Sequence, residues 1–196
     1  IARALSGVVI AIDPRHGQIQ WASTALVSSP PTSHSSHAKL IDIQAGHLIV
    51  GSPKQSQFDM PQVACFSLDS GEEVWWEELP FPIQSVVCSN SGRVLIAGTR
   101  LRAYSLSDGR PLWEHGGDDP ILAGTGTPAV YNSTVVWPTP TSLWGIDLST
   151  GTIEFERRIS IEPVAQPMEL IPAKPYWMIS RPEAVLCLPD GHVNRP

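Results

Sequence analysis

A histidine pair is the first feature of this sequence that could do chemistry. His34 and His37 stand close together in SSPPTSHSSH, and neutral imidazoles at such a spacing can bind zinc. Zinc needs three or four ligands, however, and neither a cysteine nor a carboxylate accompanies the pair in this stretch. The surrounding serines and prolines are typical of a solvated loop. The sequence therefore assigns no metal ligand here.

Two other groups of residues could support chemistry, and neither forms a recognisable site. The stretch GTGT (124–127) lacks the third glycine and the following helix of a phosphate-binding loop, so it is interpreted as the lead-in to a strand. Cys65, Cys88 and Cys187 are widely spaced and odd in number, which predicts free, structural thiols. No G-x-S-x-G nucleophile motif occurs. We therefore assign no catalytic, cofactor-binding or metal-ligating residue.

The composition indicates what kind of framework this chain builds. It has 196 residues with 42% hydrophobic content, which is enough for a sizeable core. The 19 prolines, 15 glycines and 16% charged residues favour many short elements joined by turns over long helices. We therefore expect an all-β chain.

The charge distribution excludes two classes of partner. Lys and Arg number 13 against 19 Asp and Glu, which gives a formal net charge of −6, and no basic cluster interrupts the even distribution. Nucleic acids and anionic membranes both require clustered Lys and Arg, so we predict neither as a partner. The longest apolar stretches fall far short of the roughly 20 residues that span a bilayer, so we also predict no membrane span.

An internal repeat accounts for most of the chain. Five segments align on one glycine and recur about every 40 residues. They are AIDPRHGQIQW from Ala11, CFSLDSGEEVW from Cys65, AYSLSDGRPLW from Ala103, GIDLSTGTIEF from Gly145 and VLCLPDGHVNR from Val185. Apolar residues alternate before each glycine, as in a strand with one buried face, and mostly short polar residues directly precede it. Each segment therefore predicts a β-hairpin whose turn glycine adopts a positive φ.

The repeat also places an aromatic residue four positions after the glycine. Trp21, Trp75, Trp113 and Phe155 occupy this position, whereas the last segment has Arg195. A single tryptophan can bury on the order of 200 Å², which is a large contribution to a core. We interpret these aromatic residues as packing between neighbouring repeats rather than as ligand contacts.

Two further strands precede most of the hairpins. The predicted pairs are 38–43 with 47–52, 85–90 with 93–98, 127–132 with 134–137, and 167–171 with 176–180. Four antiparallel strands in about 40 residues make one blade of a β-propeller. We expect about four and a half blades in a partial or associating propeller, with a half blade at 1–30 and blades at roughly 37–79, 80–118, 120–160 and 161–196. The first hairpin leaves no room for its two inner strands.

These segments resemble the quinoprotein-type, or PQQ-like, β-propeller repeat, whose usual form is close to A-L-D-A-x-T-G-x-x-x-W. The first segment matches it at Ala11, Asp13, Gly17 and Trp21. GTPAVYNSTVVW followed by SLWGIDLSTG resembles an entire blade of the family, and the resemblance covers nearly the whole chain.

The chain also departs from the family's repeat. The aspartate position holds Ser67, Ser105 and Cys187 in three repeats, and the last repeat lacks its aromatic residue. An atypical terminal repeat is expected at the end of a stacked array. WD-type propellers are the rival family, but these tryptophans are not followed by the Trp-Asp organisation that closes a strand in that family.

The resemblance also bears on cofactors. Enzymes of this family bind pyrroloquinoline quinone with a calcium ion, through a vicinal Cys-Cys disulfide, a stacking tryptophan and a carboxylate base. This sequence has neither a Cys-Cys pair nor an Asp/Glu/Asn cluster with calcium-loop spacing. We therefore expect no cofactor and a non-catalytic scaffold, similar in kind to the lipoprotein that helps to assemble outer-membrane barrels. The alternative is a fragment of a PQQ-dependent dehydrogenase, or a propeller domain appended to an enzyme, with pyrroloquinoline quinone and calcium.

A scaffold of this kind implies protein partners. Open strand edges invite pairing, so we expect the chain to be part of a longer propeller or to associate with another chain, the partner being the remainder of the propeller. In the long loop 52–61, Phe58 and Met60 are candidates for a partner contact, the alternative being that Phe58 packs over its own blade. The sequence leaves the compartment open, and the resemblance slightly favours an extracytoplasmic one.

Overall fold

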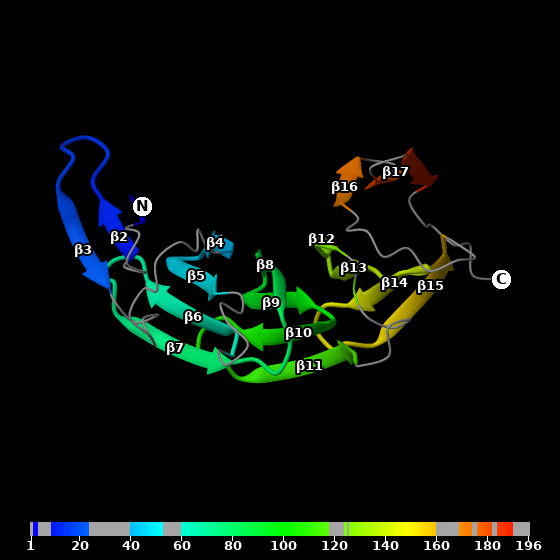
Figure 1. The fold of residues 1–196 in the computed structure, drawn as a ribbon, viewed down its shortest axis with the longest axis horizontal. Helices are drawn as coiled ribbons and strands as arrows, with labels where there is room; N and C mark the ends of the chain where they lie inside the picture. Colours follow the sequence, from blue (N-terminus) through cyan, green and yellow to red (C-terminus); the bar gives the residue numbers. More distant parts are fainter. Residues whose placement is uncertain are drawn as a thin grey trace. The chain divides into compact units, whose positions relative to one another are not determined.

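Strands joined by tight turns make up the described parts of the chain. The computed structural model describes residues 2–3, 9–23, 40–52, 60–117, 124, 126–159, 169–173, 176–181 and 184–189. Every regular element within these ranges is a β-strand. The strands form five antiparallel sheets, and each sheet consists of strands that are consecutive in the sequence (Figure 1). No helix in these ranges is long and apolar enough to cross a membrane. The fold is a partial β-propeller, as the repeat predicts.

The first two sheets contain seven strands. The first sheet consists of β1 (Ala2–Arg3), β2 (Val9–Ile12) and β3 (Ile19–Ser23) in that order. The second sheet consists of β4 (Leu40–Gln44), β5 (His47–Ser52), β6 (Gln62–Ser67) and β7 (Glu73–Glu78) in that order. The predicted strand at 47–52 coincides with β5.

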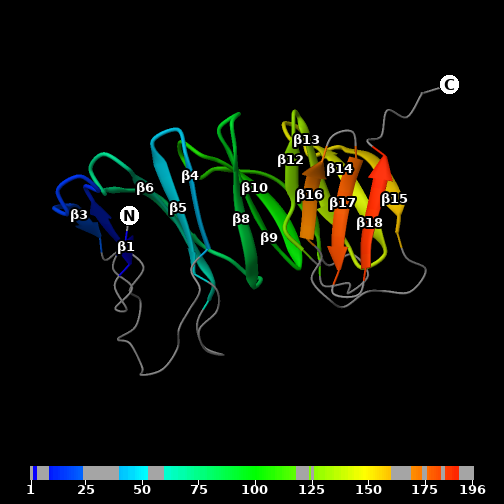
Figure 2. The same cartoon turned by 90° about the horizontal axis from the view of Figure 1, so that it is seen from above.

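The remaining three sheets repeat the same order of strands. The third consists of β8 (Ile83–Ser89), β9 (Arg93–Gly98), β10 (Arg100–Ser105) and β11 (Pro111–Gly116). The fourth consists of β12 (Ala129–Tyr131), β13 (Thr134–Pro138), β14 (Ser142–Asp147) and β15 (Ile153–Arg158). The fifth consists of β16 (Glu169–Ala173), β17 (Tyr176–Arg181) and β18 (Ala184–Pro189), which lie side by side in Figure 2. Every predicted pair of inner strands is therefore present.

The two ends of the chain depart from the four-stranded pattern. The sequence leaves no room for two inner strands before the first hairpin, and the residues described there contain one strand, the two-residue β1, which pairs with β2. The last sheet has three described strands, and residues 190–196, which include Gly191 and Arg195, lie outside the described part. The exact blade boundaries stay a prediction.

The chain divides into two compact units. Unit 1 comprises residues 1–95 and 103–111, and unit 2 comprises residues 96–102 and 112–196. The division passes through the third sheet, so that β8 belongs to unit 1 and nearly all of β11 to unit 2.

The position of a strand within its sheet decides how much of it is buried. β5 and β9 are buried from their second residue to their last, because an interior strand is covered on both faces. β7 and β15 each end a sheet, and Trp75 is the only buried residue of β7, whereas β15 has none. The continuous apolar runs of the sequence therefore mark interior strands.

A β-bulge recurs in the outer hairpin of three sheets. The register shifts between Ala11 and Ile12, between Cys65 and Phe66, and between Gly145 and Ile146. Each shift adjoins the pair that contains the repeat's aromatic residue, namely Ala11 with Trp21, Cys65 with Trp75, and Gly145 with Phe155. A bulge adds one residue and increases the local twist, so it sets the direction in which this aromatic side chain leaves the strand.

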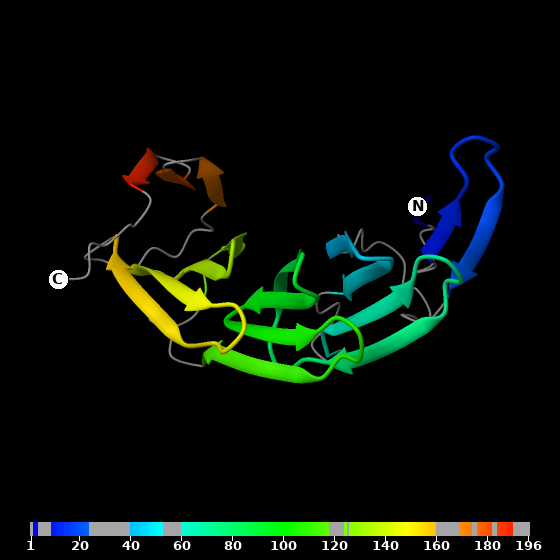
Figure 3. The ribbon, with the colours of Figure 1, turned by 180° about the vertical axis from the view of Figure 1, so that it is seen from behind.

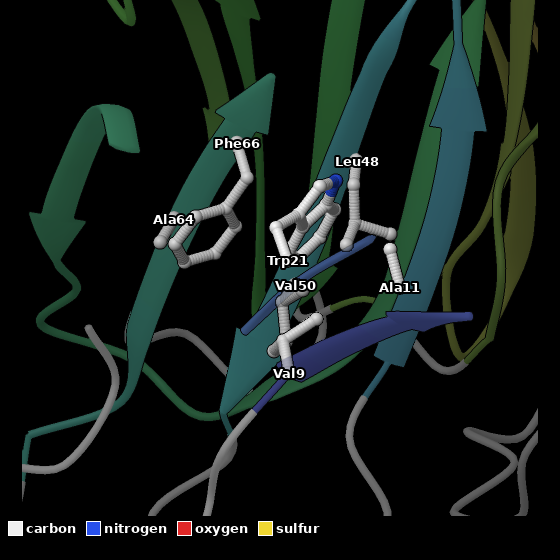
Figure 4. Packing of buried hydrophobic residues seen from close by; sticks show 7 residues of the cluster. All are labelled: Val9, Ala11, Trp21, Leu48, Val50, Ala64 and Phe66. Atoms are coloured by element: carbon white, nitrogen blue, oxygen red, sulfur yellow. The ribbon is translucent and has the colours of Figure 1, made fainter. Parts of the chain in front are cut away.

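The core of unit 1 lies between the first and second sheets. Its buried members are Val9, Ala11, Trp21, Leu48, Val50, Ala64 and Phe66. Figure 4 shows the Trp21 indole beside Leu48 and Val50, although Trp21 belongs to the hairpin of β2 and β3 that Figure 3 shows in blue. The predicted role of Trp21 in packing between repeats is therefore confirmed.

Unit 2 contains a chain of aromatic contacts. The His115 ring lies 5.6 Å from Trp113 and 6.2 Å from Trp144, measured between ring centroids. Trp144 in turn meets the wholly buried Trp137 edge to face at 5.9 Å. Edge-to-face aromatic pairs contribute more than their buried area alone, so this cluster stabilises the fourth sheet and the strand that precedes it.

Adjacent tryptophans in β7 provide a matched test of the buried aromatic position. Trp75 is 8% exposed and stacks on Tyr104, whereas Trp76 is 55% exposed. We expect Trp75→Ala to lower the free energy of unfolding by about 3 to 5 kcal/mol, because it opens a large cavity. Trp76→Ala should lower it by less than about 1 kcal/mol. Urea denaturation measures both values, and equal losses would contradict the packing role of Trp75.

Candidate functional site

The turn of the outer hairpin is the most regular polar feature of the molecule. In four repeats the glycine N–H donates to the carbonyl of the residue at the aspartate position. These bonds are Gly17 to Asp13 at 2.8 Å, Gly71 to Ser67 at 2.9 Å, Gly109 to Ser105 at 3.0 Å and Gly151 to Asp147 at 2.8 Å. The four glycines have φ values of 66°, 73°, 69° and 75°. The predicted positive-φ turn is therefore confirmed in these repeats.

Asp147 uses its carboxylate to hold one of these turns. Its Oδ1 accepts hydrogen bonds from the hydroxyl and N–H of Ser149, at 2.7 and 2.9 Å. The same atom accepts from the N–H and hydroxyl of Thr150, at 2.7 and 2.9 Å. These bonds, that of the Ser149 hydroxyl first, lower the pKa of Asp147 to about 2. A carboxylate held in this way caps a turn and is a poor general base.

Other repeats hold the hairpin turn through hydrogen bonds to different side chains. Asp13 accepts from His16 Nδ1 at 2.7 Å and from the Arg15 N–H at 2.8 Å, and these bonds, that of His16 first, lower its pKa. In the second repeat, Ser67 Oγ accepts from the Ser70 N–H at 3.3 Å. Serine therefore keeps the turn where the family's aspartate is missing.

The aromatic residue of one repeat docks on the turn of the next. The Nε1–H groups of three tryptophans each donate to a leucine carbonyl that lies three residues before the next repeat's glycine. The bonds are Trp21 to Leu68 at 2.7 Å, Trp75 to Leu106 at 2.8 Å and Trp113 to Leu148 at 3.1 Å. Each contact lies within one unit. The packing role is confirmed for these tryptophans, and the hydrogen bond is a feature that sequence reasoning missed.

The turn glycine has a second role that its φ alone does not reveal. A Cβ atom at Gly71 would lie 2.4 Å from the Trp21 ring, and one at Gly109 would lie 2.6 Å from the Trp75 ring. At Gly151 a Cβ atom would lie 2.5 Å from Trp113. These positions therefore need glycine both for the turn and to admit the preceding repeat's indole.

Cys65 and Cys88, the two cysteines with described side chains, are not activated thiols. Cys65 and Cys88 are free, and burial raises the pKa of each thiol to about 12. Thiols with such a high pKa are not nucleophiles at neutral pH. The structural role predicted for Cys65 fits its complete burial, whereas Cys88 is partly exposed. The side chain of Cys187 lies outside the described residues.

Some of the other residues considered from sequence have structural roles, and others lie outside the described part of the chain. Gly124 lies against the Trp137 ring, where a Cβ atom would come within 2.3 Å, so the first glycine of GTGT serves packing. His34, His37 and Phe58 lie outside the described residues. Met60 is 49% exposed. Within the described ranges, no group of three His, Cys, Asp or Glu side chains could hold a metal ion.

A charged cluster on the third sheet was not predicted. Arg100 Nη1 lies 2.7 Å from Glu114 Oε1, and Arg102 binds the other carboxylate oxygen. Burial raises the pKa of Glu114, but the two guanidinium groups outweigh burial and hold this pKa below its ordinary value. The partners lie on neighbouring strands, so no local spacing in the sequence reveals the cluster.

Comparison with known proteins gives one family and several solved structures. The model of a family described as outer membrane protein assembly factor BamB matches residues 5–174. No curated protein matches the sequence. BamB from Moraxella catarrhalis has a TM-score of 0.65 at 20% identity, over 95% of this chain and 53% of that chain. This chain therefore spans about half the length of that protein.

Two computationally designed proteins are also similar in structure. Ika4 has a TM-score of 0.62 at 13% identity, over 82% of this chain and 96% of that chain. Ika8 has a TM-score of 0.57 at 12% identity, over 81% of this chain and 45% of that chain. At these identities the likeness establishes the fold.

The two roles of the turn glycine can be separated by comparing two positions. Gly17→Ala should lower the free energy of unfolding by about 1 to 2 kcal/mol, because Gly17 has a positive φ and no atom within 4 Å of the added Cβ. Gly109→Ala has the same backbone cost, and its Cβ atom also clashes with the Trp75 ring. We therefore expect its loss of unfolding free energy to be at least about 1 kcal/mol larger. Urea denaturation measures the difference, and identical losses would show that the indole does not need the glycine.

The Asp147 cap predicts a pH-dependent contribution to stability. Its folded pKa is about 2 and its ordinary value 3.8, so the ionised form is favoured by folding. The contribution is therefore present above about pH 5 and is lost as the pH falls toward 2. Asp147→Ala should lower the urea midpoint at pH 7 and lower it by clearly less at pH 2, where about half of the carboxylate is protonated in the folded state.

A serine variant serves as the control for this prediction. Asp147→Ser should retain part of the cap at both pH values, because serine already holds this position in two other repeats. An alanine effect of equal size at pH 7 and pH 2 would contradict the electrostatic explanation.

Proposed function

Because the chain belongs to the family of PQQ-like propeller proteins described as outer membrane protein assembly factor BamB, we propose that it is a non-catalytic β-propeller module that serves as a protein-interaction scaffold. Its partners are proteins, and it works as part of a larger protein or assembly. The remainder of a propeller is one such partner, since the chain spans about half the length of the Moraxella BamB.

The observation that carries this proposal is the structural use of the repeat's polar residues. The carboxylate of Asp147 is occupied by its own turn, and the indole N–H groups of Trp75 and Trp113 are occupied by the next repeat. These are the side chains that the repeat offers for chemistry. Their engagement in the framework leaves loops and strand surfaces to provide function, which is the usual division in propellers.

The exposed surface supports contact with proteins. Several large apolar side chains are substantially exposed on the described strands and turns: Ile19, Ile41, Ile43, Met60, Val74, Trp76 and Ile153. A tryptophan that is 55% exposed is uncommon, because burying an indole is strongly favourable. Such residues are enriched in protein interfaces.

A spectroscopic titration tests the non-catalytic part of the proposal. Pyrroloquinoline quinone and calcium would be added to the purified chain while the quinone absorbance and the reduction of a redox dye are followed. We expect neither a saturable shift of the absorbance nor calcium-dependent dye reduction. Either signal would favour the enzyme alternative and would count against a pure scaffold.

Photo-cross-linking tests the interaction part. A photoreactive amino acid placed at Ile19, Met60 or Ile153 in the full-length protein should give discrete protein adducts in cells, because these side chains reach the surface. Absence of protein adducts from every one of these positions would overturn the scaffold proposal.

A further inference from the structure

Trp76 occupies an unusual place on the second sheet. β7 ends this sheet, with β6 as its hydrogen-bonded neighbour, so one edge of β7 has no described strand beside it. Trp76 pairs with Ala64, which is wholly buried in the core between the first and second sheets. The indole therefore continues the apolar face of that core toward the open edge, where it remains 55% exposed.

The same position carries a hydrogen-bonded carboxylate in the third and fourth sheets, whereas the first sheet has Ala22 there. Glu114 follows Trp113 and binds Arg100 and Arg102, and Glu156 follows Phe155. The Glu156 carboxylate accepts a hydrogen bond from the Ser142 hydroxyl at 2.7 Å. In the second sheet Trp76 is paired with Ala64, and Gln62, which has the register position of Ser142, donates a hydrogen bond to Glu78 at 3.2 Å. These neighbours leave the Trp76 indole 55% exposed.

Acidic residues flank Trp76 along β7. Glu72, Glu73, Glu77 and Glu78 lie in or next to β7, and no lysine or arginine occurs between Leu68 and Gly92. Glu73 pairs with Phe66, which lies in the same core cluster as Ala64, so Glu73 and Trp76 share one face of the sheet. Glu78, two residues beyond Trp76, lies on that face as well. The edge thus offers an apolar anchor between carboxylates.

We propose that β7 is a docking edge for an extended, basic segment of a partner protein. The segment adds to the sheet as a further strand, its backbone pairs with β7, and an apolar residue contacts Trp76. Lysine or arginine residues two positions to either side lie near Glu73 and Glu78. This inference rests on the proposed scaffold function and names the surface and the chemistry of one partner.

Docking requires backbone pairing with β7, an apolar residue at Trp76 and basic residues near the glutamates. Short peptides test each of these requirements. The probe is a nonapeptide with leucine at its centre, lysine two residues to either side, and threonine elsewhere. One control peptide has glutamate in place of both lysines, and another has proline on both sides of the leucine, which prevents strand pairing. Binding is followed by isothermal titration calorimetry and by the amide chemical shifts of residues 73–78.

The lysine peptide should bind the full chain, and both control peptides should bind at least about tenfold more weakly. Trp76→Ala should weaken binding of the lysine peptide about tenfold or more, as expected for an interface tryptophan. Ile153→Ala, which removes an exposed apolar residue from β15, should leave it unchanged. Glu73→Lys should also weaken binding of the lysine peptide, because it places a like charge near the peptide's lysine.

Three results would overturn this inference. They are equal binding of the glutamate peptide, unchanged binding by the Trp76→Ala variant, and no binding of the lysine peptide. In the last case the glutamates serve only to keep other strands away from an exposed edge. The scaffold proposal has a separate readout, because cross-links from Ile19, Met60 or Ile153 would persist even if β7 binds no peptide.

Discussion

The hydrogen bond from a tryptophan indole to the leucine carbonyl of the next turn is the contact on which the rest of this fold depends. It joins β-sheets that share no backbone hydrogen bonds, and it does so with a buried donor that would otherwise lose its water partner. The ring must also lie flat against the turn, so the turn must present a glycine. A single contact thus fixes the identity of two residues about 40 positions apart.

Much of this architecture follows from the sequence. The glycine period identifies the hairpins, the apolar runs locate interior strands such as β5 and β9, and the recurring tryptophan indicates packing between repeats. These features are local, because each depends on alternation or turn chemistry within one hairpin. The positive φ at Gly109 is also a local feature, because the residues beside it in the sequence already predict a turn.

Contacts between strands and between repeats were harder to foresee. The Arg100–Glu114 pair and the bond from Trp75 to Leu106 join residues that no spacing rule connects, so only the three-dimensional register brings them together. The short β1 was also missed, because two residues carry no periodic pattern. The exposure of Trp76 does not follow from its strand pattern either, because it depends on which residues lie around the edge of the second sheet.

The central claim is that the indole and the glycine of the next repeat act as one unit, and a double-mutant cycle tests it most directly. The free energies of unfolding of Trp75→Ala, Gly109→Ala and the double variant would be measured by urea denaturation. Removing the ring also removes its clash with the new Cβ, so the double variant should be more stable than additivity predicts, by about 1 to 3 kcal/mol. Additivity within about 0.5 kcal/mol would contradict the claim.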